Sequence, residues 1–396
     1  MSELVPLPEA VRVALSERPR SVLIDTAALA RVRERFDDTQ AQALGKYLEE
    51  SQSPNTLRAY RSDWIGWAAW CAREGRQALP ADPLDLAVFL AAAAEARTED
   101  GGRWAFAPST LERKAAAVAA VHAANGLSSP TRADVVRLTL RGIRRSRRAQ
   151  PKRKRPVLLH TLTELLAQLP EPGWPTEPAR RRDALVLLVG FAGALRRSEL
   201  ATISLDDVDV QTDPGTGEPV LVIRLPVTKT DPTGAHQQQV VLPRGQRPDT
   251  CPVCAHVGWT ELLEFATHDE MRTHASEHRE QPTVHRCHSF QGTALSDGTG
   301  RPLFPSVSKH GRIAATAMSG RAVAELVKRY ASKAGLDPDL FSGHSLRAGF
   351  ATQAALGGAS DREIMRQGRW TNPRTVHRYI RVANPLEDNA VTKLGL

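Results

Sequence analysis

The chain has little of what would place it outside the cell or in a membrane. Its four cysteines are irregularly spaced and too few to form a disulfide framework in 396 residues. No uninterrupted apolar run reaches the roughly 18 residues that a membrane-spanning helix needs. The opening MSELVPLPEAVRV also lacks the basic and apolar regions of a secretory signal. We therefore expect a cytoplasmic protein with reduced thiols and no membrane partner.

The chain also has no excess of acidic residues. Lysine and arginine total 53 against 44 acidic residues, which gives a formal net charge of +9. The segment 137–156, RLTLRGIRRSRRAQPKRKRP, holds ten basic residues and no acid, so removing it leaves a net charge of −1. A solvated basic tail or a localisation-type signal would have this composition. Because the run lies in mid-chain between two helical regions, it also fits a linker that follows a phosphate backbone.

Hydrophobic periodicity predicts a fold that is mainly α with a small β-sheet. The length allows two domains. Residues 1–50 carry no motif and form an extension of uncertain order. Apolar steps of three and four, with Ser53 and Asp82 as caps, predict helices from Pro54 to near Gly75, from Pro83 to Ala96, from Ser109 or Thr110 to Asn125, and from Asp134 to Arg145. These helices form an all-α domain over 51–149, which a basic linker at 150–155 joins to a second domain over 156–396.

The second domain mixes helices with a β-hairpin. TLTELLAQL and RRDALVLLVGFAGAL are helical, whereas LVIRLPVTK and HQQQVVLP have strand character and are separated by TDPTGA. Helices are predicted again for SGRAVAELVKRYASKAG, for Ser345 to Leu356, for ASDREIMRQG and for TNPRTVHRYIRV. A tail at 380–396 is long enough for one short helix.

A histidine-rich stretch over about 255–300 interrupts this domain. The preceding Cys251-Pro-Val-Cys254 is half of a zinc site, and His285, Cys287 or His288 would have to complete it. Because the second half lacks a regular spacing, we favour a polar loop with one helix, GWTELLEFATH, and predict no metal.

Scattered polar residues form a recognisable set. Arg196 and Glu199 stand three apart in ALRRSEL, Lys229 lies at the hairpin, and His344 and Arg347 begin a predicted helix. Trp370 and Tyr379 follow. Each residue alone is more often a surface pair or part of the core. Together, however, the sequence resembles the tyrosine recombinase family of phage-type integrases, whose pattern is R-x-S-E-L, a hairpin lysine, H-x-x-R, a His or Trp, and a tyrosine about nine residues later.

The resemblance implies an α-helical core-binding domain, more faintly matched, and a mixed α+β catalytic domain. It implies cutting and rejoining of duplex DNA through a 3′-phosphotyrosyl intermediate, with no cofactor. The absence of a G-x4-G-K-[ST] loop agrees with a reaction that needs no ATP. Two departures from the family are the histidine-rich stretch and CPVC, where relatives often carry C-P-V-R.

The residue types suit this chemistry. A phenol with a pKa near 10 must be activated by its surroundings to act as a nucleophile at neutral pH. Arg196 and Arg347 offer planar charged forks for the phosphate. Trp370 can donate its N–H to the phosphate, and His344 can donate a hydrogen bond or move a proton. By resemblance Lys229 protonates the leaving 5′ oxygen, and Glu199 orients the site.

Tyr379 is the candidate nucleophile among the four tyrosines. Tyr47 and Tyr60 lie outside the catalytic domain, and Tyr330 belongs to a Leu/Val-rich helix where core packing explains it.

We expect the two domains to close around duplex DNA. The main candidates for phosphate contacts are Arg144, Arg145, Lys152, Arg153 and Lys154, and the weaker ones are Arg58, Arg61, Arg113 and Lys114. The resemblance further implies a homotetramer on two DNA sites, with cyclic exchange of the C-terminal helix.

Two other classes of function stay open at this point. One is the same chemistry with another outcome, either type IB topoisomerase-like relaxation or telomere resolution. The other is a DNA-binding regulator that keeps the fold and does not cut.

Overall fold

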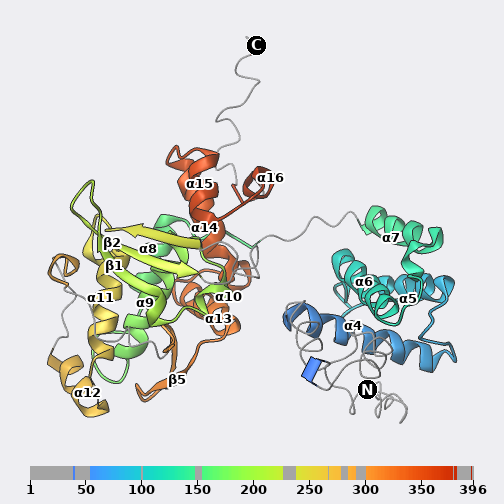
Figure 1. Cartoon of the computed structure of the whole chain (residues 1–396), viewed down its shortest axis with the longest axis horizontal. Coiled ribbons are helices and arrows are strands. Elements are labelled where there is room, and N and C mark those ends of the chain that lie inside the picture. The colour runs from blue at the N-terminus through green and yellow to red at the C-terminus, as the bar shows by residue number, and fades with distance from the viewer. Residues whose placement is uncertain are drawn as a thin grey trace. The chain divides into compact units, whose positions relative to one another are not determined.

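The chain divides into two compact units, Met1–Pro151 and Lys152–Leu396, so the division falls within the six residues expected as linker. A computed structural model (Figure 1) describes residues 39–40, 54–99, 101–147, 154–225, 238–265, 267–277, 284–290, 300–377, 379–380 and 394. Within these ranges no helix is both long enough and apolar enough to cross a membrane. Nearly all of the expected extension at 1–50 and of the tail at 380–396 lies outside the described residues.

The first unit is built from helices. They are α4 (Pro54–Arg73), α5 (Pro83–Glu95), α6 (Pro108–Ala124), the 3-10 turn η1 (Pro130–Arg132) and α7 (Asp134–Arg147). Asp82 caps α5 as predicted, accepting hydrogen bonds from the backbone N–H groups of Leu84 and Asp85. By contrast, α6 begins earlier than predicted, at Pro108, because proline takes a first helical position that needs no N–H partner.

The core of this unit joins α4 to α5 and α6. The fully buried Trp67 stacks on Trp70 at a ring-centroid distance of 5.5 Å and meets Phe89 of α5 edge to face at 5.3 Å. Each such aromatic pair adds about 0.5–1.5 kcal/mol beyond the area it buries.

The second unit packs helices around one buried helix, α9 (Glu177–Ala192), whose residues 185–190 are all buried. Its partners are α8 (Leu159–Ala167), α10 (Arg197–Leu200), α11 (Pro252–Leu263), α13 (Gly320–Lys333) and α14 (Gly343–Leu356). The remaining helices are α12 (His268–Glu277), α15 (Asp361–Gly368) and α16 (Pro373–His377). The short 3-10 turns are η2 (Leu205–Asp207), η3 (Pro248–Thr250), η4 (Cys287–Ser289) and η5 (Pro338–Leu340).

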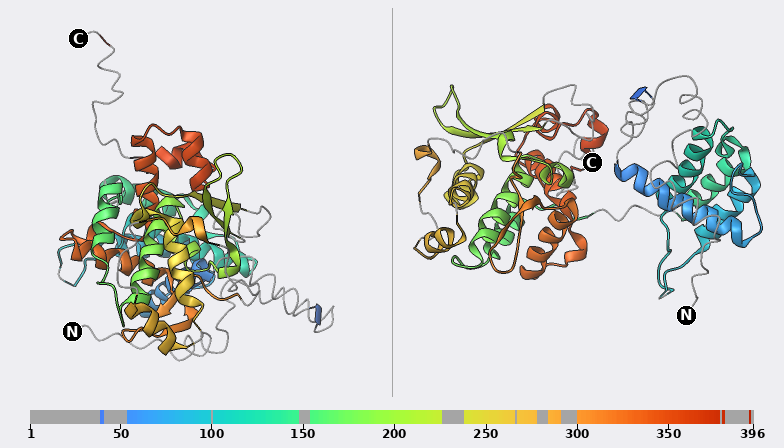
Figure 2. Two further views of the ribbon diagram at one scale, coloured as in Figure 1. Left: turned by 90° about the vertical axis from the view of Figure 1, so that its left-hand side faces the viewer. Right: turned by 60° about the horizontal axis from the view of Figure 1, so that its bottom comes forward.

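A three-stranded antiparallel sheet lies on one side of these helices (Figure 2). Its strands are β1 (Val208–Thr212), β2 (Pro219–Leu225) and β3 (Gln238–Pro243), with β2 in the middle. The predicted hairpin is the β2–β3 pair, in register with Leu221 opposite Leu242. The first strand, β1, was not predicted. Strands β4 (Pro305–Val307) and β5 (Ile313–Ala317) form a separate pair.

After Cys251 the prediction of a polar loop with one helix at 258–268 is wrong for residues 252–257, because the helix already begins at Pro252 and covers residues 252–263. These residues form α11, which is mostly buried and packs along α9. Trp259 is fully buried and donates its indole N–H to the carbonyl oxygen of Leu303, 2.8 Å away. The apolar residues Val253, Val257 and Leu262 match a helical face, but the surrounding histidines masked that signal.

Candidate active site

The first site segment is the sharp turn between α9 and α10. Ala194 adopts a left-handed backbone with φ of 48°, which ends α9 and lets the chain turn into α10. Arg196 is the N-cap of α10 and pairs with Glu199 one turn later. The Arg196 backbone N–H donates to Oε2 of Glu199 at 2.8 Å, and its Nη1 donates to Oε1 at 2.5 Å. The first arginine of the motif is therefore fixed by the carboxylate of the same motif.

The second site segment is α14, which carries Arg347. Ser342 caps this helix, so it begins at Gly343, two residues earlier than predicted. Arg347 is only 1% exposed, and its two Nη atoms donate to the backbone carbonyls of Ala194 and Gly368. Arg347 therefore joins the α9–α10 turn to the end of α15.

The third site segment follows α15 and carries Trp370. The ring centroid of Trp370 lies 4.1 Å from the guanidinium carbon of Arg347, a cation–π contact in a buried setting. Gly368 makes this packing feasible, because a Cβ atom there would lie 1.8 Å from Cζ3 of Trp370.

Tyr379 approaches His344 across the site. The hydroxyl of Tyr379 lies 3.2 Å from Nε2 of His344, although the two are 35 residues apart in the chain. The tyrosine ring packs on Trp370 at a centroid distance of 5.4 Å, and its carbonyl oxygen accepts a hydrogen bond of 2.9 Å from the Thr352 hydroxyl. The C-terminal segment is thus docked onto α14, and the hydroxyl is held beside a group that can take its proton.

Arg369 is a member of this cluster that the sequence analysis missed. It has a left-handed backbone with φ of 53° at the end of α15, and its Nη2 donates to Oε2 of Glu199 at 2.9 Å. Glu199 is therefore held between Arg196 and Arg369. In the sequence, the position of Arg369 next to Trp370 was the only sign of a role. Its partner Glu199 lies 170 residues away in the chain.

The charges of the cluster favour an anion. Burial, followed by the nearby charges of Arg196 and Arg369, lowers the pKa of Arg347 to about 9, so its guanidinium stays protonated at neutral pH. Burial alone would raise the pKa of Glu199, but Arg369 and Arg196 outweigh it and hold that pKa below the ordinary value. Three guanidinium groups thus face one ionised carboxylate. A phosphate would complete this balance.

The fold therefore brings together most of the predicted catalytic residues from separate segments. They are Arg196, Glu199, His344, Arg347, Trp370 and Tyr379. Lys229 lies outside the described residues. Tyr330, predicted to be a core residue, is 1% exposed and donates its hydroxyl to Asp183 at 2.7 Å. The hydroxyl of Tyr330 is therefore bonded to a residue that does not belong to this cluster.

The basic candidates of the first unit differ in exposure. Arg145 is exposed on α7, and Arg144 is exposed but pairs with Glu112 at 3.0 Å. Arg58, also exposed, donates to Asn55 at 2.8 Å. Lys154, at the start of the second unit, donates to the carbonyl oxygen of Asp339 at 2.5 Å. Arg61 is partly buried on α4, whereas Lys152 and Arg153 lie outside the described residues.

Lys114 does not fit the role of a phosphate contact that the sequence suggested. It is 8% exposed, lies 3.5 Å from the buried carboxylate of Asp63, and sits over the ring of Phe106 at 4.7 Å. Arg113 pairs with the same carboxylate through bonds of 2.7 and 3.2 Å. The two basic residues therefore neutralise a buried acid, and Lys114 serves the packing of α6 against α4.

Comparison with known proteins gives the family of the chain. The phage integrase family model matches residues 277–385, which include His344, Arg347, Trp370 and Tyr379. An integrase/recombinase xerD homolog of Selenomonas ruminantium is 31% identical over 350 residues, covering 88% of this chain and 87% of that protein. Recombinase cre of Escherichia phage P1 is 27% identical over 341 residues, covering 83% and 84%.

A solved structure shares the fold. The crystal structure of XerH site-specific recombinase bound to palindromic difH substrate has a TM-score of 0.50 and 12% identity, covering 97% of this chain and 93% of that one. The 31% identity with the Selenomonas ruminantium protein extends over most of both chains and shows the family. The chain belongs to the phage integrase family of tyrosine recombinases.

Proposed function

We propose that the chain is a site-specific DNA recombinase or integrase that cuts and rejoins duplex DNA through a 3′-phosphotyrosyl intermediate. The observation that carries the proposal is the 3.2 Å contact between the Tyr379 hydroxyl and Nε2 of His344, next to the buried guanidinium of Arg347. A nucleophile, a proton acceptor and an anion-binding group are thus collected from two distant segments.

In the first step the Tyr379 oxygen attacks the phosphorus of one strand. The bond from phosphorus to the 5′ oxygen breaks, and a tyrosyl bond to the 3′ phosphate forms. The phenolic proton moves toward Nε2 of His344, and Lys229, in the sequence between β2 and β3, supplies a proton to the leaving 5′ oxygen. Because one phosphoester replaces another, a second 5′ hydroxyl can reverse the step on a new strand without ATP.

The two motif arginines bind the charge that develops on the non-bridging oxygens. Arg347 is oriented by the two carbonyls that its Nη atoms hold, and Arg196 is oriented by Glu199. Hydrogen bonds between charged groups contribute about 1.5–3 kcal/mol each. This preorganised positive charge stabilises the phosphorane-like transition state, as a bound metal ion does in other phosphoryl-transfer sites. The proposed reaction therefore needs no metal ion at this site.

The DNA partner follows from the relatives and from the basic surface. The XerH structure holds its difH substrate, and the exposed arginines of α7 together with the basic linker suit a phosphate backbone. We extend the proposal to a homotetramer acting on two specific sites, with exchange of the C-terminal helix between protomers.

Covalent trapping tests the proposal. The DNA sequence that the purified chain protects from nuclease is built into a nicked duplex, so that cleavage releases a short fragment and leaves the chain attached. We expect an adduct on a denaturing gel in buffer without ATP and without added divalent metal ions. A protein that protects the site but forms no adduct on any strand is a regulator, which contradicts the proposal.

A second assay separates recombination from its chemical relatives. Two labelled duplexes that carry the protected site are incubated with the chain, and we expect recombinant joints in which each product holds one arm from each duplex. Relaxation of a supercoiled plasmid with no exchanged arms would identify a topoisomerase-like enzyme. Conversion of the site into closed hairpin ends would identify a telomere resolvase.

A further inference from the structure

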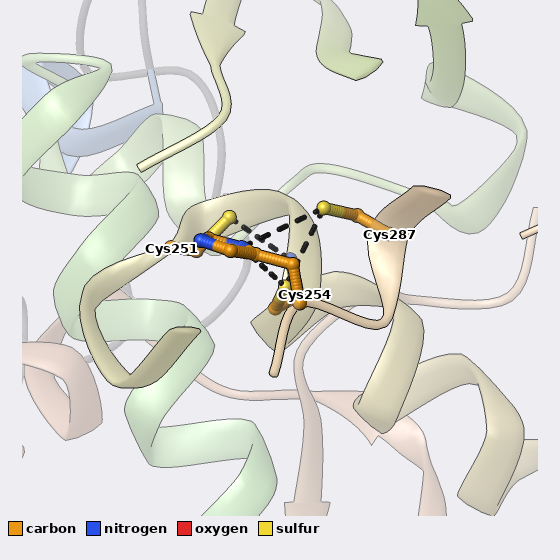
Figure 3. A group of neighbouring side chains, drawn as sticks. Cys251, Cys254 and Cys287 are labelled. Carbon is orange, nitrogen blue, oxygen red and sulfur yellow. Dashed lines mark hydrogen bonds between the residues drawn. The ribbon is translucent and has the colours of Figure 1, made fainter. Parts of the chain in front are cut away.

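Three thiols that lie outside the active site have no role in the proposed cleavage of DNA. Cys251 and Cys254 lie at the start of α11, and Cys287 lies in η4, 33 residues further along the chain. All three are buried, and their side chains point toward one another (Figure 3). His285, from the same segment as Cys287, completes a group whose ligand atoms all lie within 4.8 Å of one another.

We propose that Cys251, Cys254, His285 and Cys287 bind a structural zinc ion. Zinc lies about 2.3 Å from a thiolate sulfur and about 2.0–2.1 Å from an imidazole nitrogen, so the donors of a tetrahedral site are about 3.5–3.8 Å apart. Sγ of Cys254 lies 3.5 Å from Sγ of Cys287 and 3.3 Å from Nδ1 of His285, and the latter two are 3.9 Å apart. These three donors are therefore already at the spacing of one metal shell, and the sulfur of Cys251 lies within 4.8 Å of each of them.

The surroundings of the four residues suit metal ligands. Nε2 of His285 lies 3.4 Å from the carbonyl oxygen of Gln246, so the tautomer that donates there leaves the lone pair of Nδ1 facing the sulfurs. Sγ of Cys251 accepts backbone N–H groups from Cys254 at 3.4 Å and from Gly245 at 3.3 Å. A Cβ on Gly245 would lie 2.8 Å from Cα of Cys251, so only glycine allows this approach.

The donor set selects the kind of ion and its role. Three thiolates and one imidazole are soft and borderline ligands, which zinc prefers and which magnesium and calcium do not. Three of the four ligands are buried, and four protein ligands leave no position for a substrate. The ion would join two segments, the start of α11 and residues 284–290, and Gly245 and Gln246 in the loop after β3 contact its ligands.

The fold shows which histidine completes the site, which the spacing in the sequence did not show. Over 251–265, 267–277 and 284–290, the other described histidines have other neighbours: His256 faces Phe290, His268 faces Trp174, His274 faces Phe265, and Nε2 of the exposed His288 lies 3.5 Å from the carboxylate of Glu218. Only His285 of these reaches the sulfurs. Because 30 residues separate it from Cys254, the second half of the site had no recognisable spacing in the sequence.

A disulfide is the competing use of these thiols. The sulfurs of Cys254 and Cys287 are 3.5 Å apart, whereas a disulfide needs about 2.05 Å. All four cysteines of the chain are free in this structure. Thiol counting distinguishes the two: with zinc at this site all four cysteines of the chain, Cys71 included, react after denaturation with a chelator, whereas a disulfide leaves two of them unreactive.

Metal analysis of the full chain tests the proposal. Protein purified under reducing conditions without chelator is expected to hold one zinc ion per chain, and Cys254→Ser or Cys287→Ser is expected to reduce this to near zero. Two controls should keep the ion: Cys71→Ser, which alters a buried cysteine of the first unit, and His288→Ala, which alters the exposed histidine next to Cys287. His285→Cys should retain zinc, because a fourth thiolate replaces the imidazole.

Cobalt makes the test independent of whether the variants fold. The wild-type chain is stripped with a chelator and titrated with Co²⁺ alone. We expect thiolate-to-cobalt charge-transfer absorption, the visible bands of tetrahedral cobalt, and their loss when Zn²⁺ is added. The proposal is overturned if the reduced wild-type chain takes up neither ion, if the cobalt bands are octahedral, or if the cysteine variants hold as much zinc as the wild type.

Discussion

The guanidinium carbon of Arg347 lies 4.1 Å above the ring of Trp370, and the same ring packs against Tyr379 at 5.4 Å between centroids. One buried side chain therefore contacts both the proposed phosphate-binding arginine and the proposed nucleophile. Because Arg347 also holds the carbonyls of Ala194 and Gly368, the position of the tyrosine depends on the same contacts that orient the arginine. Catalysis and local stability are consequently coupled at this point.

Arg347→Lys should separate charge from geometry. Lysine keeps the positive charge but cannot hold two carbonyls and stack on Trp370 together. Adduct formation on the nicked duplex should slow by about 10²–10³-fold, the usual cost of removing a preorganised donor to a developing oxyanion. Single-turnover kinetics measure it. Arg321→Lys, an exposed position on α13, is the matched control, and an equal loss in that variant would contradict the assignment.

Glu199→Gln should destabilise the second unit in a pH-dependent way. The folded-state pKa of Glu199 is lowered, so its ionisation stabilises the fold above the unfolded-state pKa of about 4.3. This contribution disappears as the pH falls through the lower, folded-state value. Removing the carboxylate between Arg196 and Arg369 should cost about 3–5 kcal/mol at neutral pH.

Urea unfolding of the wild type and of Glu199→Gln at neutral and at acid pH measures this effect. The two free energies of unfolding should differ most at neutral pH and converge in acid. A difference that stays constant across this range would show that the charge of Glu199 contributes nothing.

Gly368→Ala should disrupt the site by steric overlap. The added Cβ would fall 1.8 Å from Cζ3 of Trp370, so the indole must move away from Arg347 and Tyr379. We expect a loss of about 1–3 kcal/mol in stability and a slower cleavage rate. Gly258→Ala is the control, because nothing lies within 4 Å of its added Cβ in the interior of α11, and it should be neutral or stabilising. Thermal unfolding of both variants decides.

Arg145 and Lys114 should behave oppositely as DNA-binding residues. Arg145→Gln removes an exposed charge of α7, so DNA affinity should fall and the slope of log K against log salt should decrease by about 0.9. Lys114→Gln should instead lower the stability of the first unit, because Lys114 is buried beside Asp63. Binding isotherms at several salt concentrations, with unfolding curves of both variants, test this pair. A salt slope changed by Lys114→Gln alone would reverse our assignment.

Local signals explain how much of the fold could be predicted from the sequence. The helices α4, α5 and α13 follow their predicted ranges because each has a capping residue or an initial proline and a clear apolar face. Strand β1 was not predicted because it is short and mostly polar, with only Val208 buried. The first half of helix α11 was not predicted, because histidines around it obscured an apolar face that α9 covers.

The site shows the same division between local and distant information. Arg196 with Glu199 and His344 with Arg347 stand at short helical spacings, so the motifs could be recognised in the chain. Arg369 could not, since its role depends on a left-handed turn and on a carboxylate 170 residues away. His285 was named in the sequence as one of three residues that could complete the CPVC half-site, but only the folded chain shows that it reaches Cys254.

Peptide mapping of the trapped adduct tests the central claim most directly. The chain is trapped on the nicked duplex, digested with trypsin and nuclease, and the peptide that carries the nucleotide is sequenced by mass spectrometry. We predict that the phosphate is attached to Tyr379, that Tyr379→Phe forms no adduct, and that Tyr60→Phe forms it normally. A nucleotide found on another residue, or an adduct that persists in Tyr379→Phe, would contradict the account.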